Sequence, residues 1–218
     1  MKRLLLHTCC APCGTSVFET LLNEKEYEVT SFYCNPNIKP REEWSKRLAE
    51  LEKLVDFMKS EPLRHACACH LPLTGEDDTL ILNPPLLRGG ADEVGGGVRF
   101  SVDLVVSGYN QNEFDKVARG LEDEAEGGRR CEKCFRLRLL RTAEHAKANG
   151  FEAFGTTLTV SPHKNADLIN RIGREVSAIV GIEFLERDFK KGDGYKRSIE
   201  LCREHGIYRQ NYCGCIFA

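Results

Sequence analysis

Apolar residues in this sequence follow two patterns, short buried runs typical of strands and longer stretches with the three-to-four-residue spacing of helices. Strands are predicted at Arg3–His7, Tyr27–Tyr33, Val102–Val106 and Phe154–Leu158. Helices are predicted at Thr15–Lys25, Arg41–Lys59, Asn112–Glu126, Cys131–Ala148, Asn165–Val180 and Tyr195–His205. Strands that alternate with helices at this spacing predict an α/β fold with a parallel sheet and right-handed crossovers.

One stretch interrupts this alternation. From about Glu61 to Arg99 the sequence has neither a strand nor a helix period, and it contains Pro-Pro, Gly-Gly and Gly-Gly-Gly. A structureless stretch of this length is uncommon within a domain. We therefore predict one α/β domain over residues 1–218, with an insertion or long loop at about 61–99.

Composition narrows the class of protein. With 218 residues, 41% of them hydrophobic and 29% charged, the chain resembles an ordinary globular protein. No apolar run approaches the ~18 residues that a membrane span needs. The few apolar residues before Cys9 fit a first buried strand better than a signal peptide. These features predict a cytoplasmic protein without membrane association.

Eleven cysteines are unusual for a protein of the reducing cytosol. Because disulfides rarely persist there, the cysteines indicate metal binding, redox chemistry or buried thiols. Seven of them form three clusters at the ends of predicted elements, namely Cys9-Cys10-Ala-Pro-Cys13, Cys131-Glu-Lys-Cys134 and Cys213-Gly-Cys215. Cys34 and Cys202 fit buried apolar positions, and Cys67-Ala-Cys69-His70 in the insertion lacks an evident partner pair for a closed metal site.

The first two clusters are expected to meet. Cys9 and Cys10 follow the first strand at the carboxyl edge of the sheet, where ligands bind in open parallel sheets. Cys131 and Cys134 open a helix, whose positive end lowers thiol pKa values. Four thiolates suit either tetrahedral zinc or a [4Fe–4S] cluster. Adjacent cysteines make a poor zinc knuckle, so the iron–sulfur cluster is favoured, with zinc and unmetallated thiols as alternatives.

The third cluster allows several interpretations. Two thiols separated by one glycine, Cys213 and Cys215, form either a labile redox-active disulfide or a pair that binds a metal. An inert pair near a frayed terminus is the alternative. The aromatic and polar segment that precedes them, Tyr208–Tyr212, argues against a flexible tail.

Basic residues gather around Cys131 and Cys134. The group comprises Arg129, Arg130, Lys133, Arg136, Arg138 and Arg141. The formal net charge of −2 gives no global attraction to nucleic acid, so an RNA contact needs a local patch of this kind. A solvated helix face is the alternative, and about half of these arginines are expected to face the core and anchor carboxylates.

Several motifs in order along the chain resemble the QueH-type, cobalamin-independent epoxyqueuosine reductases. They are CCAPC at Cys9–Cys13, YCNPNIKP at Tyr33–Pro40, EGGRRCEKCF at Glu126–Phe135, TLTVSP at Thr157–Pro162 and YRQNYCGC at Tyr208–Cys215. The resemblance covers nearly the whole chain outside the insertion. It implies a Rossmann-like fold related to the adenine nucleotide α-hydrolase group. It also implies the last step of queuosine biosynthesis, the two-electron reduction of the epoxide of epoxyqueuosine at the wobble position of the tRNA anticodon.

The resemblance also implies roles for individual cysteines. Cys9, Cys10, Cys131 and Cys134 would ligate the [4Fe–4S] cluster. Cys213 and Cys215 would form a redox-active pair or bind a second metal, such as iron, together with position 13. Some family members have aspartate at that position, whereas this chain has Cys13. The second site would store an electron or act as a Lewis acid on the epoxide oxygen.

A tRNA substrate and an external electron donor of the ferredoxin or flavodoxin type are the partners that this function implies. The target nucleotide has to leave its stack, so stacking on Tyr33, Tyr208 or Tyr212 is expected. The candidate substrate-binding residues are Arg129, Arg130, Arg136, Asn35, Asn37, Tyr208, Arg209 and Gln210.

Two other functions fit parts of the sequence. A zinc-binding, non-catalytic RNA-binding module would use the same cysteines and would be colourless. A tRNA sulfurtransferase of the ATP-pyrophosphatase type needs a Ser-Gly-Gly-x-Asp-Ser phosphate loop after the first strand. The segment His7–Pro12 occupies that place and contains no such loop, which argues against ATP binding.

Overall fold

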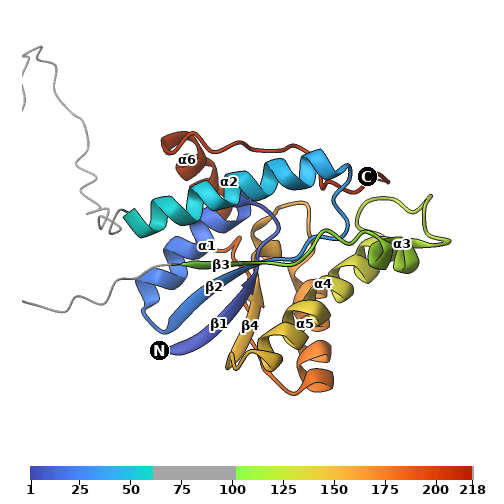
Figure 1. Cartoon of the computed structure of the whole chain (residues 1–218), viewed down its shortest axis with the longest axis horizontal. Coiled ribbons are helices and arrows are strands. Elements are labelled where there is room, and N and C mark those ends of the chain that lie inside the picture. Colours follow the sequence, from blue (N-terminus) through green and yellow to red (C-terminus); the bar gives the residue numbers. More distant parts are fainter. Residues whose placement is uncertain (61–101, 218) are drawn as a thin grey trace, which may run out of the picture.

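Five parallel strands form the central sheet of the computed structural model, which describes residues 1–60 and 102–217 (Figure 1). The strand order is β3-β2-β1-β4-β5. The strands are β1 (Lys2–His7), β2 (Tyr27–Tyr33), β3 (Asp103–Val106), β4 (Ala153–Thr156) and β5 (Glu183–Phe184). The insertion predicted at 61–99, with Cys67 and Cys69, lies outside the described residues.

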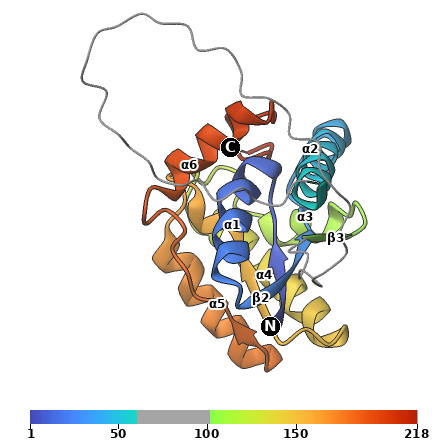
Figure 2. The ribbon, with the colours of Figure 1, turned by 90° about the vertical axis from the view of Figure 1, so that its left-hand side faces the viewer.

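Helices cover both faces of the sheet (Figures 1 and 2). One face carries α1 (Ala11–Glu24) and α2 (Arg41–Ser60), and α6 (Gly194–Glu204) packs on α1. The other face carries α4 (Arg129–Ala148) and α5 (Ala166–Val180), and the short helix α3 (Asn112–Ala118) packs on α4. The predicted Rossmann-like α/β fold is therefore confirmed.

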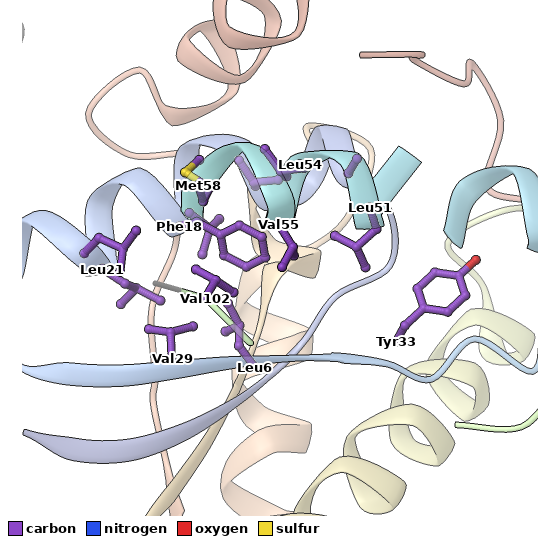
Figure 3. Packing of buried hydrophobic residues seen from close by; sticks show 14 of the residues in the cluster. Leu6, Phe18, Leu21, Val29, Tyr33, Leu51, Leu54, Val55, Met58 and Val102 are labelled. Carbon is purple, nitrogen blue, oxygen red and sulfur yellow. The ribbon is translucent and has the colours of Figure 1, made fainter. Parts of the chain in front are cut away.

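Side chains of β1 alternate between the two layers of the core because successive strand residues point to opposite faces. Leu4 and Leu6 join the layer under α1 and α2, whereas Leu5 joins the layer under α4 and α5. Figure 3 shows the first layer, in which Phe18 of α1 and Leu54 of α2 pack towards Leu6 and Val29. β1 is the central strand of the sheet, and its side chains from Leu4 to His7 are buried on both faces.

The sheet order reverses between β1 and β4. The chain lays down β1, β2 and β3 in one direction and then β4 and β5 in the other. In open α/β sheets, ligands bind outside the carboxyl ends of the strands at such a reversal. Cys9 and Cys10 follow β1 after Thr8, and the 3-10 helix η1 (Thr157–Val160) directly follows β4. The fold thus positions these two segments at the expected binding edge.

Three predicted elements differ clearly from the structure. The helix expected over Thr15–Lys25 begins earlier, at Ala11, because Pro12 is tolerated in the first turn of a helix. The helix expected over Asn112–Glu126 ends at Ala118, because Gly120 takes a left-handed conformation (φ +76°) and the chain turns there. The strand expected over Phe154–Leu158 ends at Thr156, where the Oγ1 atom accepts a hydrogen bond from the Leu158 N–H and starts η1. The two-residue strand β5 was not predicted. Across the described part of the chain, the longest helices are too polar to span a bilayer.

Candidate active site

Three thiols, Cys9, Cys10 and Cys13, form the first cluster of the site, here called the N-terminal thiols. Their three Sγ atoms lie within 4.8 Å of one another, close enough to hold a metal ion together. Cys9 and Cys10 occupy the turn after β1, and Cys13 lies in the first turn of α1. Pro12 is tolerated there because its missing N–H falls among the unpaired donors of a helix start.

The three N-terminal thiols differ in their pKa values. Hydrogen bonds from Cys10 and Cys13 hold the pKa of Cys9 well below its usual value. A hydrogen bond from Cys13 lowers the pKa of Cys10, but its bond to Cys9 and burial outweigh this effect and raise that pKa to about 12. Hydrogen bonds to Cys10 and Cys9 raise the pKa of Cys13. Cys9 is therefore the first of the three thiols to ionise, and a bound metal would ionise them all.

A second thiol set consists of Cys131, Cys134, Cys213 and Cys215, which line one small cavity of about 40 Å³. Cys131 lies in the first turn of α4, where its Sγ accepts a hydrogen bond from the Gly127 N–H at 3.2 Å. Burial raises the pKa of Cys134 to about 12. The second thiol set therefore consists of two cysteines from the start of α4 and two from the carboxyl-terminal tail.

The carboxyl-terminal tail, which contains Cys213 and Cys215, is held in place by hydrogen bonds to its backbone carbonyls. The Arg47 guanidinium donates to the carbonyl of Cys213 at 2.9 Å, and the Lys39 N–H donates to the carbonyl of Gly214 at 2.9 Å. Gly214 has φ +95°, and a Cβ there would lie 2.9 Å from Arg47 Nη1. Only glycine fits between the two cysteines, because the turn needs both a left-handed backbone and the space that Arg47 fills.

The structure places the cysteines of the three sequence clusters in two neighbouring groups. Cys13 lies within 4.8 Å of Cys9 and Cys10, and it also lines the large open cavity together with Cys213, so the predicted site of Cys13 with Cys213 and Cys215 stays a prediction. Cys213 and Cys215 lie beside Cys131 and Cys134. Cys131 also packs against the apolar cluster that contains Cys9 and Cys10, so both thiol sets lie at the same edge of the sheet. The ligand set Cys9, Cys10, Cys131 and Cys134 remains a prediction.

Two cationic side chains lie at the junction of the thiol sets. Arg138 is 2% exposed and directs Nη1 towards Cys134 Sγ at 3.9 Å. Burial lowers the pKa of Lys164, but the charges on Cys9, Cys13 and Cys213 outweigh burial and raise it. Lys164 was missed at the sequence level, although its position two residues after the TLTVSP motif was a signal that could have identified it.

A larger, open cavity of about 450 Å³ adjoins both thiol sets. Its volume lies in the range of small-molecule binding sites. Cys13 contributes from the N-terminal thiols and Cys213 from the second set, and Lys164 lines this cavity as well as the smaller one. The remaining polar and aromatic wall includes His163, Tyr195, Ser198, Arg209, Gln210, Asn211 and Tyr212.

Comparison with known proteins assigns this arrangement to a family. The chain matches the family described as "Epoxyqueuosine reductase QueH" over residues 4–69 and 96–218. It is 35% identical to the protein of that name from Streptococcus pyogenes, covering 99% of this chain and 69% of the relative. It is 31% identical to that from Thermotoga maritima, covering 100% of this chain and 91% of the relative. The chain belongs to the QueH family.

The family match agrees with the resemblance in the motifs and with the oxidoreductase class that it implied. A second match, 36% identical to the protein named epoxyqueuosine reductase QueH from Staphylococcus epidermidis, covers 99% of this chain and 76% of the relative. All of the thiols of the two sets lie within the matched residues. The large cavity between them is thus part of a QueH scaffold.

Some of the predicted substrate-binding residues lie on the cavity or the surface. Arg209 and Gln210 line the large cavity, and Gln210 also donates to Cys10 Sγ at 2.8 Å. Tyr208 is half-buried beneath Lys46, whose Nζ lies 3.5 Å from the ring centroid. Arg129 is exposed and pairs with Glu124, while Arg136 pairs with Glu175. These residues remain candidates for substrate contact.

Other predicted substrate contacts are buried, and all of them except Asn37, whose Oδ1 accepts no hydrogen bond within the described residues, have protein partners. Arg130 donates to the carbonyls of Leu121, Glu122, Glu124 and Phe217, so its guanidinium faces the protein interior. Asn35 and Asn37 are each 1% exposed. Tyr33 is fully buried, and its hydroxyl donates to the Trp44 carbonyl at 2.9 Å. Substrate contact by Arg130, Asn35 and Asn37 stays a prediction, whereas stacking of a nucleotide on Tyr33 is incompatible with the burial of its ring.

The donor set fits a [4Fe–4S] cluster. Thiolates are the ligands that such clusters take, and hydrogen bonds to sulfur tune them. The second thiol set opens a helix and already receives the Gly127 N–H on Cys131. Arg138 and Lys164 supply positive charge beside the thiols. An anionic sulfur-rich group would therefore find both ligands and countercharge at this edge.

Proposed function

We propose that this chain is an epoxyqueuosine reductase that converts epoxyqueuosine at the wobble position of tRNA to queuosine. Membership in the QueH family supports this activity. The observation that carries the proposal is the cavity of about 450 Å³ lined by cysteines of both thiol sets. Two electrons and two protons turn an epoxide into an alkene and water, so a redox centre has to border the substrate cavity.

Cys9, Cys10, Cys131 and Cys134 are the residues that would hold the [4Fe–4S] cluster in this proposal. When bound, the cluster supplies electrons one at a time from an external ferredoxin- or flavodoxin-like donor. Cys213 and Cys215 act as a redox pair or, with Cys13, bind a second metal such as iron. The shared cavity of Cys13 and Cys213 supports the second arrangement, and the packing of Cys213 and Cys215 beside Cys134 supports the first.

The cavity wall would bind the modified base after it leaves the anticodon stack. A flipped base is held by stacking and by hydrogen bonds to its edges. Tyr212 offers an exposed ring at the cavity, and the Arg47 guanidinium lies 4.9 Å from its centroid on the protein side. Arg209 and Gln210 offer donors on the same tail segment. The tail thus brings base recognition and the Cys213–Cys215 pair into one segment.

Lys164 is the residue that we assign to the oxygen released from the epoxide. It lines the substrate cavity, and nearby thiolates keep it protonated although burial opposes this. A cation at the place where an alkoxide develops stabilises that charge, and a proton from the same group neutralises it. Lys164 therefore supplies a function that no cysteine on the cavity wall supplies.

Anaerobic purification tests the proposed cofactor directly. The protein should be brown, with about four irons and four sulfides per chain. Cys131→Ala or Cys134→Ala should remove the colour and the reductase activity together. Cys34→Ala is the matched control, because Cys34 is a buried thiol outside both sets. Stoichiometric zinc without sulfide would favour the non-catalytic zinc module instead.

The same preparation distinguishes the reductase from the remaining alternative, a tRNA sulfurtransferase. A sulfurtransferase would consume ATP and leave sulfur on the RNA. Reductase activity requires neither. Conversion of epoxyqueuosine in tRNA to queuosine by the reduced protein without ATP is the expected result, and ATP-dependent transfer of sulfur would contradict the proposal.

A further inference from the structure

Arg138 of α4 is one of the most deeply buried charged side chains in the described part of the chain. Its residue exposure is 2%. Each of its three guanidinium nitrogens has a different partner. Nε donates to His7 Nε2 at 3.1 Å, Nη2 donates to Asn35 Oδ1 at 2.7 Å, and Nη1 lies 3.9 Å from Cys134 Sγ.

None of these partners is a carboxylate. Within residues 1–60 and 102–217, Arg138 forms no ion pair with Asp or Glu, although Arg136 and Arg141 of the same helix pair with Glu175 and Glu113. A buried cation without a countercharge is strongly disfavoured. The anion that stabilises Arg138 has to come from another kind of group.

The thiols would provide that countercharge once metal binding ionises them, because the unligated Cys134 thiol has a pKa of about 12. Burial lowers the pKa of Arg138, but thiolate charge on Cys134, Cys9 and Cys213 outweighs burial and raises it. His7 adds no positive charge, because burial and the adjacent Arg138 lower its pKa to about 3. Its Nδ1 lies 3.0 Å from Thr156 Oγ1, and its Nε2 lies 3.1 Å from Arg138 Nε and 3.2 Å from the Cys34 carbonyl.

Arg138 also links the two halves of the proposed ligand set. Asn35, which accepts from Arg138, donates through Nδ2 to the carbonyl of Thr8 at 3.1 Å. Thr8 immediately precedes Cys9. The guanidinium is therefore connected to the Cys9–Cys10 turn through Asn35 and to Cys134 directly. The rigid fork of arginine suits such a three-way contact, whereas lysine supplies only a point charge.

We propose that Arg138 is a positioning residue that holds the Cys9–Cys10 turn against Cys134 and offsets the negative charge of the thiolate-bound cluster. This inference rests on the proposed [4Fe–4S] cofactor. Reduction adds one negative charge to the cluster, and a fixed cation beside the ligands favours the reduced form. Arg138 therefore raises the reduction potential of the cluster.

Three substitutions distinguish the effect of the positive charge of Arg138 from the effect of its hydrogen-bonding geometry. Arg138→Met removes both, Arg138→Lys keeps the charge and loses the fork, and Asn35→Asp places a near-isosteric carboxylate against the guanidinium. Arg141→Met is the control, because it removes a half-exposed arginine of the same helix. The measurements on anaerobically purified protein are iron and sulfide content, thermal unfolding and the reduction potential from a spectroelectrochemical titration.

The Met and Asp variants are expected to have a more negative potential than the parent. The Lys variant should stay near the parent's potential but retain less iron and sulfide, and the Arg141 control should match the parent in both. Should the Met variant not fold, Arg138→Gln, which removes the charge and keeps a polar side chain, takes its place, because Asn35→Asp also loses the Nδ2 donor to the Thr8 carbonyl. An unchanged potential in every folded Arg138 and Asn35 variant overturns the inference. A parent without iron and sulfide overturns the proposed cofactor, and the inference with it.

Discussion

Two arginines of α4 show how partners rather than sequence position determine the role of a residue. Arg130 and Arg138 are both almost completely buried. Arg130 donates to backbone carbonyls of the segment before α4 and of the tail, so it stabilises a turn and a terminus. Arg138 contacts Cys134, His7 and Asn35 at the site. The sequence placed both in one basic cluster and predicted that about half of its members face the core, but spacing could not identify their partners.

A residue-scale prediction concerns Tyr33. Tyr33→Phe removes the buried hydrogen bond to the Trp44 carbonyl and should lower the free energy of unfolding by about 1 kcal/mol. Because the ring is buried, tRNA affinity should stay at the parent's value. Urea denaturation and tRNA titration measure the two effects. Unchanged stability together with weaker tRNA binding would return Tyr33 to the substrate site.

The paired thiols of the tail give a second prediction at this scale. The double variant Cys213→Ser, Cys215→Ser should keep the iron, sulfide and visible colour but lose turnover, because the pair lies beside the proposed ligands without belonging to them. Iron analysis and single-turnover reduction of epoxyqueuosine measure this separation. Loss of colour would instead make Cys213 or Cys215 a cluster ligand, and full activity would make the pair inert.

At the scale of elements, the sequence predicted most of the sheet and its helices because their core faces are continuous. The strand Tyr27–Tyr33 was predicted with its observed bounds, and the helix Arg41–Lys59 differs from α2 by one residue. The strand β5 has only two residues and therefore offers no detectable alternation. Hydrophobic periodicity and length were sufficient to predict an element wherever that element buries one long apolar face.

The helix predicted over Asn112–Glu126 was too long because its acidic second half has tertiary partners. Carbonyls of Leu121, Glu122 and Glu124 turn inward and accept hydrogen bonds from Arg130. In a continuing helix these carbonyls would accept from the next turn instead. Helix propensity is a weak preference, and a buried arginine that needs acceptors outweighs it. Gly120 was a local stop signal for this helix, whereas no local pattern reveals the acceptors that Arg130 needs.

The start of α5 provides a prediction for an element beside the site. The Asn165 side chain caps the helix by accepting from the Leu168 N–H at 3.0 Å. Asn165→Ala should therefore lower the free energy of unfolding by about 1 kcal/mol. Asn165→Asp preserves the acceptor and is the control expected to match the parent. Equal stability of the Ala variant, measured by urea denaturation, would show that water replaces the cap.

For the whole molecule, the site combines segments that are far apart in the sequence. The turn after β1, the start of α4, the segment between η1 and α5, and the tail converge on two adjoining cavities. Parallel-sheet topology allowed the first two segments to be placed together in advance. The tail could not be placed, because it docks through backbone carbonyls that Arg47 and Arg130 bind. These contacts do not depend on the side chains of the tail, so no sequence pattern in the tail predicts them.

The route of the tRNA across this molecule is the last testable feature. Arg129 and Arg136 lie on α4 near the second thiol set, and both reach solvent, with side-chain exposures of 76% and 35%. If both contact backbone phosphates, the double variant Arg129→Gln, Arg136→Gln should flatten the salt dependence of tRNA binding. Each lost contact should reduce the log–log slope by about 0.7 to 0.9.

The buried Arg130 supplies the comparison that makes this measurement decisive. Arg130→Gln should destabilise the turn before α4 and the end of the tail, yet keep the parent's slope, because its guanidinium binds carbonyls in the interior. Iron and sulfide content should be unchanged in the double variant, since neither of its side chains is a ligand. Affinity at several salt concentrations measures the slopes. A parent-like slope in the double variant would mean that the tRNA crosses another basic surface, such as the Lys190–Arg197 segment, and that the ion pairs of Arg129 and Arg136 with Glu124 and Glu175 are purely structural.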